Sequence, residues 1–288
     1  MLIIFNPAAG RRRTQLLWRV LDVMAASGVR LEIAETRHAG HATELAREGA
    51  RRGERLVVAA GGDGTIAEIA NGLVDTPARL GVIPLGTANV LAHELGLPFA
   101  PRAVAAALAF GRTRAVWPGI ACGADGPRLF VQMVGAGFDA QVVHHMSSPL
   151  KRALGRSAYV MQSLRELIRY RFRPIEVRVD GRVIETGSVV VTKGQYYAGM
   201  FRLAPGASPM APDFTVALFG GCGPLAVLAY GAALPFDLVP KMPGLRLIRA
   251  SRIEIESARV PTQADGDPAG MAPIIVTNAP TPIRVVVG

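Results

Sequence analysis

The first 117 residues alternate between short apolar runs and stretches with helical spacing, and this alternation limits the possible folds more than any other feature of the chain. Such a pattern predicts a parallel sheet covered by helices on both faces. The expected strands are Leu2–Phe5, Leu31–Thr36, Leu56–Ala60 and Gly81–Leu85, and the expected helices are Gln15–Ala26, Ala42–Arg52, Ile66–Val74, a helix after Thr87 that runs through Leu95, and Ala103–Phe110.

The pattern changes after Trp117-Pro118, where short alternating runs predict a β-rich, mostly antiparallel domain. Asp180-Gly181 between two runs indicates a tight hairpin, and a helix is expected from about 150 to 170. We therefore expect an α/β domain over 1–117 and a β-rich domain over 118–288, with a last strand near 284–287 that can return to the first domain. The expected strands of the second domain are Leu129–Val134, Ile175–Val179, Val183–Ile184, Ser188–Thr192, Phe214–Phe219, Arg252–Glu256, Ile274–Thr277 and Arg284–Val287.

One uncharged stretch, Phe214–Phe236, has the length of a membrane span. Its glycines and proline favour instead a buried strand over 214–219, a turn, and a buried helix over 225–234. The N-terminal apolar run ends at Phe5 and does not resemble a signal peptide. The cysteines, Cys122 and Cys222, form neither a disulfide framework nor a metal-binding spacing, which favours a cytoplasmic protein.

Three of the first strands end in small polar loops that lead into helices: Asn6–Gly10, Gly61–Thr65 and Gly86–Asn89. In an open α/β sheet such loops share one edge, where ligands bind. Glycines let the main chain approach an anion, and helix N-termini offer free N–H groups to it. The three loops together predict a site for a phosphate-bearing ligand, although neither a P-loop nor a dinucleotide fingerprint occurs.

The chain has a formal charge of +10 but only three lysines, none before Lys151. Phosphate bound in the first domain must therefore be held by arginine, main-chain amides or metal. Arg11, Arg12 and Arg13 follow the first loop and either contact phosphate or begin a solvated helix.

Several of these loop residues could have a purely structural role in place of ligand binding. Thr65 and Glu68 match a capping box, which would satisfy helix N–H groups without any chemistry. Thr87 and Asn89 either cap a helix or bind a nucleotide or substrate hydroxyl. Asp63 lies between glycines, where a carboxylate would repel phosphate unless it holds a metal or accepts a proton.

These motifs follow one another in the order of a known family. They are NPAAG at Asn6–Gly10, Thr36 with Ala39–Ala42, GGDGT at Gly61–Thr65, Glu68 with Asn71-Gly72, PLGTAN at Pro84–Asn89, Leu95–Pro98, Gly137–Ala140 and Asp265-Gly266-Asp267. The chain resembles the diacylglycerol kinase catalytic domain family, which includes sphingosine kinases and small bacterial lipid kinases. NAD kinases share only the GGDGT part of the series.

The resemblance implies a two-domain lipid kinase that transfers the γ-phosphoryl group of ATP to a lipid hydroxyl with Mg²⁺. It also implies that the acid–base residue is in Asp265-Gly266-Asp267, where the family has Asp-Gly-Glu, or is Asp63. We add Arg11 and Asn89 from the loop argument above to the positions that match nucleotide contacts. The nucleotide-binding candidates are then Asn6, Pro7, Ala8, Ala9, Gly10, Arg11, Thr36, Gly61, Gly62, Asp63, Gly64, Thr65, Ile66, Ala67, Thr87 and Asn89.

The sequence departs from the family at two places. Asp267 is one methylene shorter than the family's glutamate, so either the main chain compensates or Asp63 or Asp265 serves instead. Related bacterial kinases also carry an Asp-Gly pair that helps bind a structural Mg²⁺ in the loop after Pro205–Ser208. This chain reads Met210–Asp213 there, so that Asp213 is the candidate ligand if the loop shifts.

Residues 151–173 contain seven basic residues and one acidic residue, which gives this segment six of the ten net positive charges. Helical spacing of Leu150, Leu154, Met161, Leu164 and Ile168, with Tyr159, Tyr170 and Phe172 as interfacial aromatics, predicts transient contact with an anionic membrane. The alternative is a helix packed on the core with solvated arginines. Nucleic acid is not expected, because no nucleic-acid motif accompanies the charge.

The function expected from the sequence is therefore phosphorylation of a diacylglycerol-type or sphingoid-type lipid. A soluble kinase of the NAD kinase type and a non-catalytic lipid- or nucleotide-binding protein are the alternatives. No feature of the sequence indicates the lipid acceptor or the oligomeric state.

Overall fold

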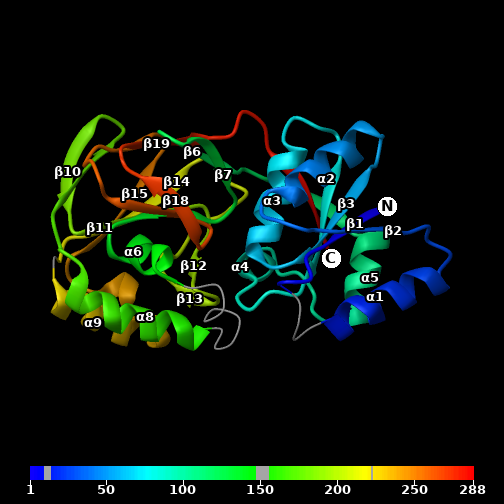
Figure 1. The fold of residues 1–288 in the computed structure, drawn as a ribbon, viewed down its shortest axis with the longest axis horizontal. Coiled ribbons are helices and arrows are strands. Elements are labelled where there is room, and N and C mark those ends of the chain that lie inside the picture. Colours follow the sequence, from blue (N-terminus) through cyan, green and yellow to red (C-terminus); the bar gives the residue numbers. More distant parts are fainter. Residues whose placement is uncertain (10–13, 147–155, 222) are drawn as a thin grey trace. The chain divides into compact units, whose positions relative to one another are not determined.

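The computed structural model describes residues 1–9, 14–146, 156–221 and 223–288. It contains two compact units, Met1–Pro118 with Ala279–Gly288, and Gly119–Asn278 (Figure 1). The sequence argument placed the division at residue 117 and left the course of the last strand open. Several residues named above lie outside the described residues: Gly10, Arg11, Arg12, Arg13, Leu150, Lys151, Leu154 and Cys222.

The first unit is an α/β domain. Its strands are β1 (Leu2–Phe5), β2 (Glu32–Glu35), β3 (Leu56–Gly61), β4 (Arg79–Pro84), β5 (Arg112–Val116) and β20 (Ile283–Val287). Its helices are α1 (Thr14–Ala26), α2 (His41–Arg51), α3 (Asp63–Leu73), α4 (Val90–Glu94) and α5 (Pro101–Phe110). The sheet has the order β2-β1-β3-β4-β20-β5, and every neighbouring pair is parallel except β20 with β5.

Helices cover both faces of this sheet, as the alternation predicts (Figure 1). Side chains alternate along β1, so that Ile3 and Phe5 pack in one core with α1 and α5. Leu2 points to the other face, where a Cβ atom at Gly49 of α2 would lie 2.6 Å from its Cδ2. Helix α2 packs closely on α3 there. Both faces are therefore apolar, which explains the continuous apolar runs of these strands.

The second unit contains antiparallel sheets. Its strands are β6 (Gly119–Gly123), β7 (Gly126–Phe130), β8 (Met133–Ala136), β9 (Ile175–Val179), β10 (Arg182–Thr186), β11 (Ser188–Thr192), β12 (Tyr196–Tyr197), β13 (Phe201–Arg202), β14 (Phe214–Phe219), β15 (Leu245–Ala250), β16 (Ile253–Ile255), β17 (Pro261–Ala264), β18 (Asp267–Met271) and β19 (Ile274–Asn278). Its helices are α6 (Phe138–His144), α8 (Arg156–Arg169), α9 (Pro224–Ala233) and the short 3-10 turns η1 (Leu234–Phe236) and η2 (Val239–Lys241).

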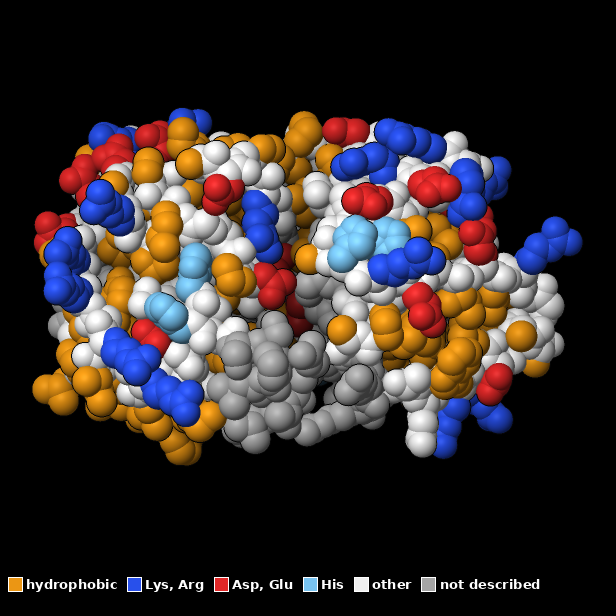
Figure 2. Space-filling view, viewed as in Figure 1, with side chains coloured by type: hydrophobic (Ala, Val, Ile, Leu, Met, Phe, Trp, Pro, Cys, Tyr) orange, Lys and Arg blue, Asp and Glu red, His pale blue; other side chains and the backbone are white. Residues whose placement is uncertain are grey.

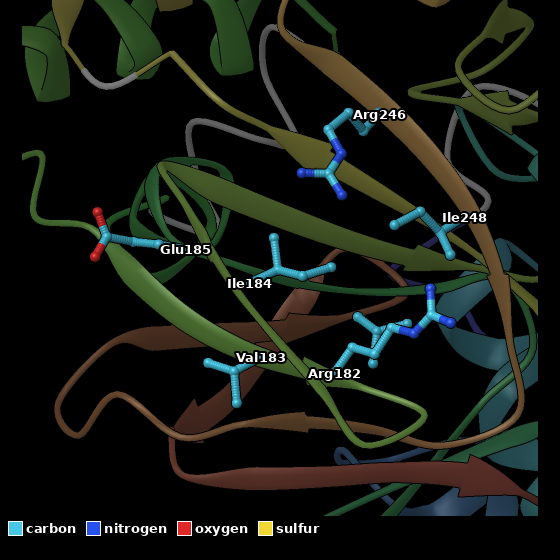
Figure 3. Close-up of a pocket in the computed structure, with 7 residues that line it drawn as sticks. Arg182, Val183, Ile184, Glu185, Arg246 and Ile248 are labelled. Carbon is cyan, nitrogen blue, oxygen red and sulfur yellow. The ribbon is translucent and has the colours of Figure 1, made fainter.

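Two six-stranded sheets, β10-β9-β16-β19-β6-β7 and β15-β14-β11-β8-β17-β18, enclose one apolar core, and β12 and β13 form a separate pair. The sheets leave a shallow hollow at their edge strands β10 and β15 (Figure 3). Ile184 and Ile248 line it and pack on the core, and Arg182 and Arg246 also line it. The hollow contains none of the predicted site residues.

Strands β9, β11 and β14 have the predicted bounds, and the β9–β10 hairpin has the predicted turn, with positive φ at both Asp180 and Gly181. The single strand predicted over Leu129–Val134 is wrong. The chain leaves one sheet after β7 and enters the other at β8, crossing at Val131 and Gln132. Apolar composition alone does not reveal this crossing, because both strands contribute to the same core.

The buried helix predicted over 225–234 is also wrong. Helix α9 forms over Pro224–Ala233 but has no buried residue, and the side chain of Leu225 is 82% exposed. No helix within the described residues has the length and hydropathy needed to cross a lipid bilayer.

Candidate active site

The loops after β1, β2, β3 and β4 meet at one edge of the first sheet. Phe5 pairs with Ala60, and Ala60 pairs with Ile83, so that these parallel strands end side by side. Main-chain bonds continue the alignment past the strands, because Asn6 donates to Ala60 at 3.0 Å and Thr36 donates to Phe5 at 2.9 Å. The predicted nucleotide-binding residues of the described chain are therefore gathered at this edge.

The first loop is bonded to the start of α3. The side-chain amide of Asn6 donates to Oγ1 of Thr65 at 3.0 Å, and its carbonyl oxygen accepts the N–H of Ala8 at 2.9 Å. Thr65 is buried, whereas Pro7 and Ala8 are exposed. Asn6 therefore shapes the turn and fixes its distance from α3.

The glycines of the second and third loops touch each other. A Cβ atom at Gly86 would lie 2.5 Å from Cα of Gly62, and one at Gly62 would lie 3.2 Å from Cα of Gly86. A Cβ atom at Gly61 would overlap the side chain of Thr65. These glycines are thus required by the contact between loops, in addition to any approach of a ligand.

Asp63 is the first residue of α3, and its carboxylate reaches the start of α4. Oδ1 accepts the N–H of Leu91 at 3.2 Å. Burial raises the pKa of Asp63, while the main-chain N–H groups of Val90, Leu91 and Asn89 oppose this rise. Asp63 therefore links two helix N-termini, which is a structural role that its position between glycines did not reveal.

Asn89 is the residue before α4 and has a left-handed main chain with φ 49°. Its side chain is buried and makes no capping bond, because the amide donates back to the carbonyl of Gly86 at 2.8 Å. Among the described residues nothing donates to its Oδ1. A buried acceptor without a partner is costly, and a ligand hydroxyl or a cation would satisfy it. The acceptor, with the Asp63 carboxylate at the same helix end, fits an oxygen-binding cation such as Mg²⁺.

The capping box predicted for Thr65 and Glu68 is wrong. Helix α3 begins at Asp63, so Thr65 lies within its first turn. Glu68 accepts the N–H of Ala42 at 3.1 Å and therefore serves the N-terminus of α2 instead. Spacing within one helix cannot reveal a bond to a neighbouring helix.

The remaining loop residues differ in what they can offer to a ligand. The N–H groups of Gly64 and Thr65 lie in the first turn of α3, where a helix provides no acceptor, whereas the N–H of Asp63 donates to its own carboxylate. Ile66 donates its N–H to Gly62 and buries its side chain, so it can shape the site but cannot contact a ligand directly. Thr87 is exposed and accessible.

In the second unit, Asp265 and Gly266 form a two-residue turn between β17 and β18, with φ of 50° and 82°. The Asp265 carboxylate accepts three main-chain N–H groups, from Val131 at 2.7 Å, Gln132 at 2.8 Å and Met133 at 2.9 Å. These bonds hold the chain where it crosses between the sheets. Asp265 is thus a structural anchor, and the half-buried Asp267 is the other acidic side chain of the motif.

A buried polar network supports the same turn. Oε1 of Gln263 accepts the N–H of Gly266 at 2.9 Å, and Nε2 of Gln263 donates to Oδ2 of Asp139 at 3.0 Å. The hydroxyl of Tyr197 donates to the other Asp139 oxygen. Burial raises the pKa of both Asp139 and Tyr197. Sequence reasoning assigned no role to this network, although the Gly137–Ala140 motif contains its aspartate.

Asp213, the candidate ligand for a structural Mg²⁺, points its carboxylate elsewhere. Oδ2 lies 3.6 Å from Nη1 of Arg249, and the main-chain carbonyl of Asp213 accepts a bond from Lys193. The Lys193 ammonium already occupies oxygen atoms of this loop, and a Mg²⁺ ion at the same oxygens would be repelled by its positive charge.

Known proteins share both units. The diacylglycerol kinase catalytic domain matches residues 1–119, and the YegS C-terminal NAD kinase beta sandwich-like domain matches residues 132–287. A diacylglycerol kinase of Bacillus subtilis (strain 168) is 31% identical over 99% of this chain and 95% of its own length. A protein of Pseudomonas putida named "probable lipid kinase YegS-like" is 36% identical over 54% of this chain and 52% of its own length.

A solved structure from Bacillus anthracis str. Sterne, provisionally assigned as a diacylglycerol kinase, has the same fold, with a TM-score of 0.80 and 23% identity. It is matched over 100% of this chain and 94% of that one. The chain belongs to the diacylglycerol kinase family, and it is a kinase.

The three bonds of Asp265 lead to a prediction on stability. Asp265→Ala removes the acceptor of three N–H groups and is expected to lower the free energy of unfolding by about 3 kcal/mol. Asp267→Ala is expected to cost about 1 kcal/mol or less. Urea unfolding of both variants checks the difference, and equal losses would contradict the assigned anchor role.

The raised pKa of Asp63 predicts a pH dependence. A carboxyl group whose pKa is higher in the folded state makes folding less favourable as pH rises above its unfolded value. Asp63→Asn keeps an acceptor for Leu91 but loses the charge. We subtract the melting temperature of the unsubstituted protein from that of Asp63→Asn. This difference is expected to be more positive at pH 7.5 than at pH 4. A difference that does not vary with pH, measured by thermal unfolding, would argue against a buried charged carboxylate.

Proposed function

We propose that the protein transfers the γ-phosphoryl group of ATP to a hydroxyl of a diacylglycerol-type or sphingoid-type lipid, with Mg²⁺. The observation that carries the proposal is the convergence of four loops at one sheet edge, with the N-terminus of α3 on one loop and, on another, the Oδ1 of Asn89, which has no partner among the described residues. Family membership supports a kinase, and the names of the relatives support a lipid acceptor.

On the nucleotide side, the N–H groups of Gly64 and Thr65 and the dipole of α3 would hold phosphate oxygens. Bound Mg²⁺ would neutralise phosphate charge, and Asp63 and Asn89 are the residues that would hold it. Phosphoryl transfer depends mainly on positioning and charge stabilisation, which rigid loops supply.

On the lipid side, Asp267 is the residue proposed to accept the proton of the attacking hydroxyl. Asp265 is committed to main-chain bonds, and Asp139 is buried beneath the turn, so neither is placed to act as a base. The anchor at Asp265 and the network through Gln263 hold the turn from which Asp267 extends. Rigid support of this kind would keep the Asp267 carboxylate in one position, which a proton transfer requires.

Contact with a membrane surface is part of the proposal, because α8 buries polar side chains and exposes apolar ones. Its inward face carries Ala158, Gln162 and Glu166, and Glu166 accepts bonds from Gln162 at 2.8 Å and from Gln141 at 3.2 Å.

The outward face of α8 carries Val160, Leu164 and Ile168, with Ile168 90% exposed. The alternative of an apolar face packed on the core therefore does not hold for Leu164 and Ile168. Tyr170 and Phe172, expected at the interface, pack instead with Phe138.

Helix α9 extends this apolar surface. It contacts α8 and exposes Leu225, Leu228 and, just beyond its end, Phe236. Figure 2 shows hydrophobic side chains gathered at the lower left, over α8 and α9, with basic side chains beside them. Each apolar side chain that enters a bilayer contributes about 1.5–3 kcal/mol, and each arginine near an anionic surface contributes about 1 kcal/mol. Transient docking suits an enzyme that collects its substrate from the membrane.

The kinase assignment predicts that the purified protein with Mg²⁺ and [γ-³²P]ATP labels diacylglycerol or a sphingoid base in mixed micelles. Asp63→Asn and Asp267→Asn are each expected to lower the rate about 100-fold or more, whereas Asp267→Glu is expected to retain activity. Asp22→Asn, an exposed site on α1, is the matched control. NAD is tested as an alternative acceptor, and labelling of NAD alone would contradict the lipid assignment.

The docking surface predicts co-sedimentation with vesicles that contain phosphatidylglycerol. Ile168→Glu removes apolar burial and adds a negative charge, so we expect binding about 10-fold weaker or more. Phe110→Glu is the control, because Phe110 also lies in the last turn of a helix and is 88% exposed, but belongs to the first unit. Equal binding of Ile168→Glu and the unsubstituted protein would refute the surface.

A further inference from the structure

The loop before β14 surrounds the side-chain ammonium of Lys193. Lys193 directly follows β11, and its side chain is fully buried. Nζ donates to the carbonyl oxygens of Ala211 at 3.3 Å and Asp213 at 3.1 Å, and to Oδ1 of Asn278. The ring centroid of Phe214 lies 4.1 Å away.

The surroundings match the needs of an ammonium group. Its three hydrogens have three oxygen acceptors, and the aromatic face adds a favourable cation–π contact. A buried charge is tolerated only when it is paired or fully hydrogen-bonded. Burial lowers the pKa of Lys193 to about 8, with the nearby Asp213 opposing the shift, so the group is charged at pH 7.

The acceptors are also those that a hard divalent cation would use, since two are main-chain carbonyls and one is a side-chain amide oxygen. A Mg²⁺ ion at these oxygens would lie against the ammonium, and the two positive charges would repel each other. The Asp213 carboxylate, which could offset this repulsion, faces Arg249 instead.

We propose that the ammonium of Lys193 replaces a structural divalent cation in this chain and closes the 208–213 loop onto the end of β19 without metal. The contact fixes three segments that are distant in sequence: the end of β11, the 211–213 stretch and Asn278. Asn278 reinforces it, because its amide nitrogen donates to the carbonyl of Pro212. Loop order is then a property of the chain and independent of the Mg²⁺ concentration.

Thermal unfolding without nucleotide tests this proposal. A structural Mg²⁺ at 100 times its dissociation constant would raise the melting temperature by about 5–10 °C over the value in EDTA. We expect the two melting temperatures to agree within about 1 °C. Because Mg²⁺ can also bind at Asp63, any rise is measured again in Asp63→Asn, and a rise that persists there overturns the proposal.

The role of the ammonium is tested with Lys193→Met, which keeps the length of the side chain and removes the charge. We expect a melting temperature lower by about 5 °C or more that Mg²⁺ does not restore. Lys241→Met changes an exposed lysine of the same unit, and we expect it to have the same melting temperature as the unsubstituted protein. If Lys193→Met melts like this control, the proposal is overturned.

A measurement on the unsubstituted protein remains decisive if Lys193→Met does not fold. An amine-acylating reagent followed by peptide mass spectrometry is expected to modify Lys241 and spare Lys193, with the same protection in EDTA as in Mg²⁺. Rapid acylation of Lys193 in EDTA alone would show that a metal, and not the ammonium, holds the loop closed.

Discussion

The carboxylate of Asp265 makes the interaction on which the second unit depends. It accepts three consecutive main-chain N–H groups where the chain crosses from one sheet to the other, between the end of β7 and the start of β8. The same bonds fix the turn that presents Asp267. One side chain therefore joins the two sheets and orients the proposed catalytic carboxylate, so that the stability of the unit and the geometry of its site have a common origin.

In the first unit, hydrogen bonds and close contacts between the loops hold the site together. Asn6 is bonded to Thr65, Gly62 touches Gly86, and Asp63 reaches the start of α4. The loops hold one another, and among the described residues of this unit the Asn89 Oδ1 atom is buried without a hydrogen-bond partner. A site that is already assembled before a ligand binds loses little entropy on binding, which suits a reaction that depends on positioning.

Soluble proteins usually bury apolar side chains and expose charged ones, and the second unit does the opposite at two places. Lys193 and Glu166 are buried with hydrogen-bonding partners, while Leu164, Ile168 and Leu225 are exposed. A buried charge is stable only when its partners are already in place, and an exposed apolar surface requires a partner of its own. Both reversals therefore mark places where function or loop order, and not core packing, accounts for the residue.

The sequence by itself determined the parallel sheet, the sheet edge at which the glycine loops gather and the family, because strand period, loop glycines and motif order are local properties. It also predicted the amphipathic helix near 151–173, but not which face points inward. Only the tertiary structure decided that β20 enters the first sheet, that Glu68 serves α2, that Asp265 is an anchor and that Lys193 fills the 208–213 loop. Each depends on a hydrogen bond between residues far apart in the chain, and a pattern of neighbouring residues carries no information about such a bond.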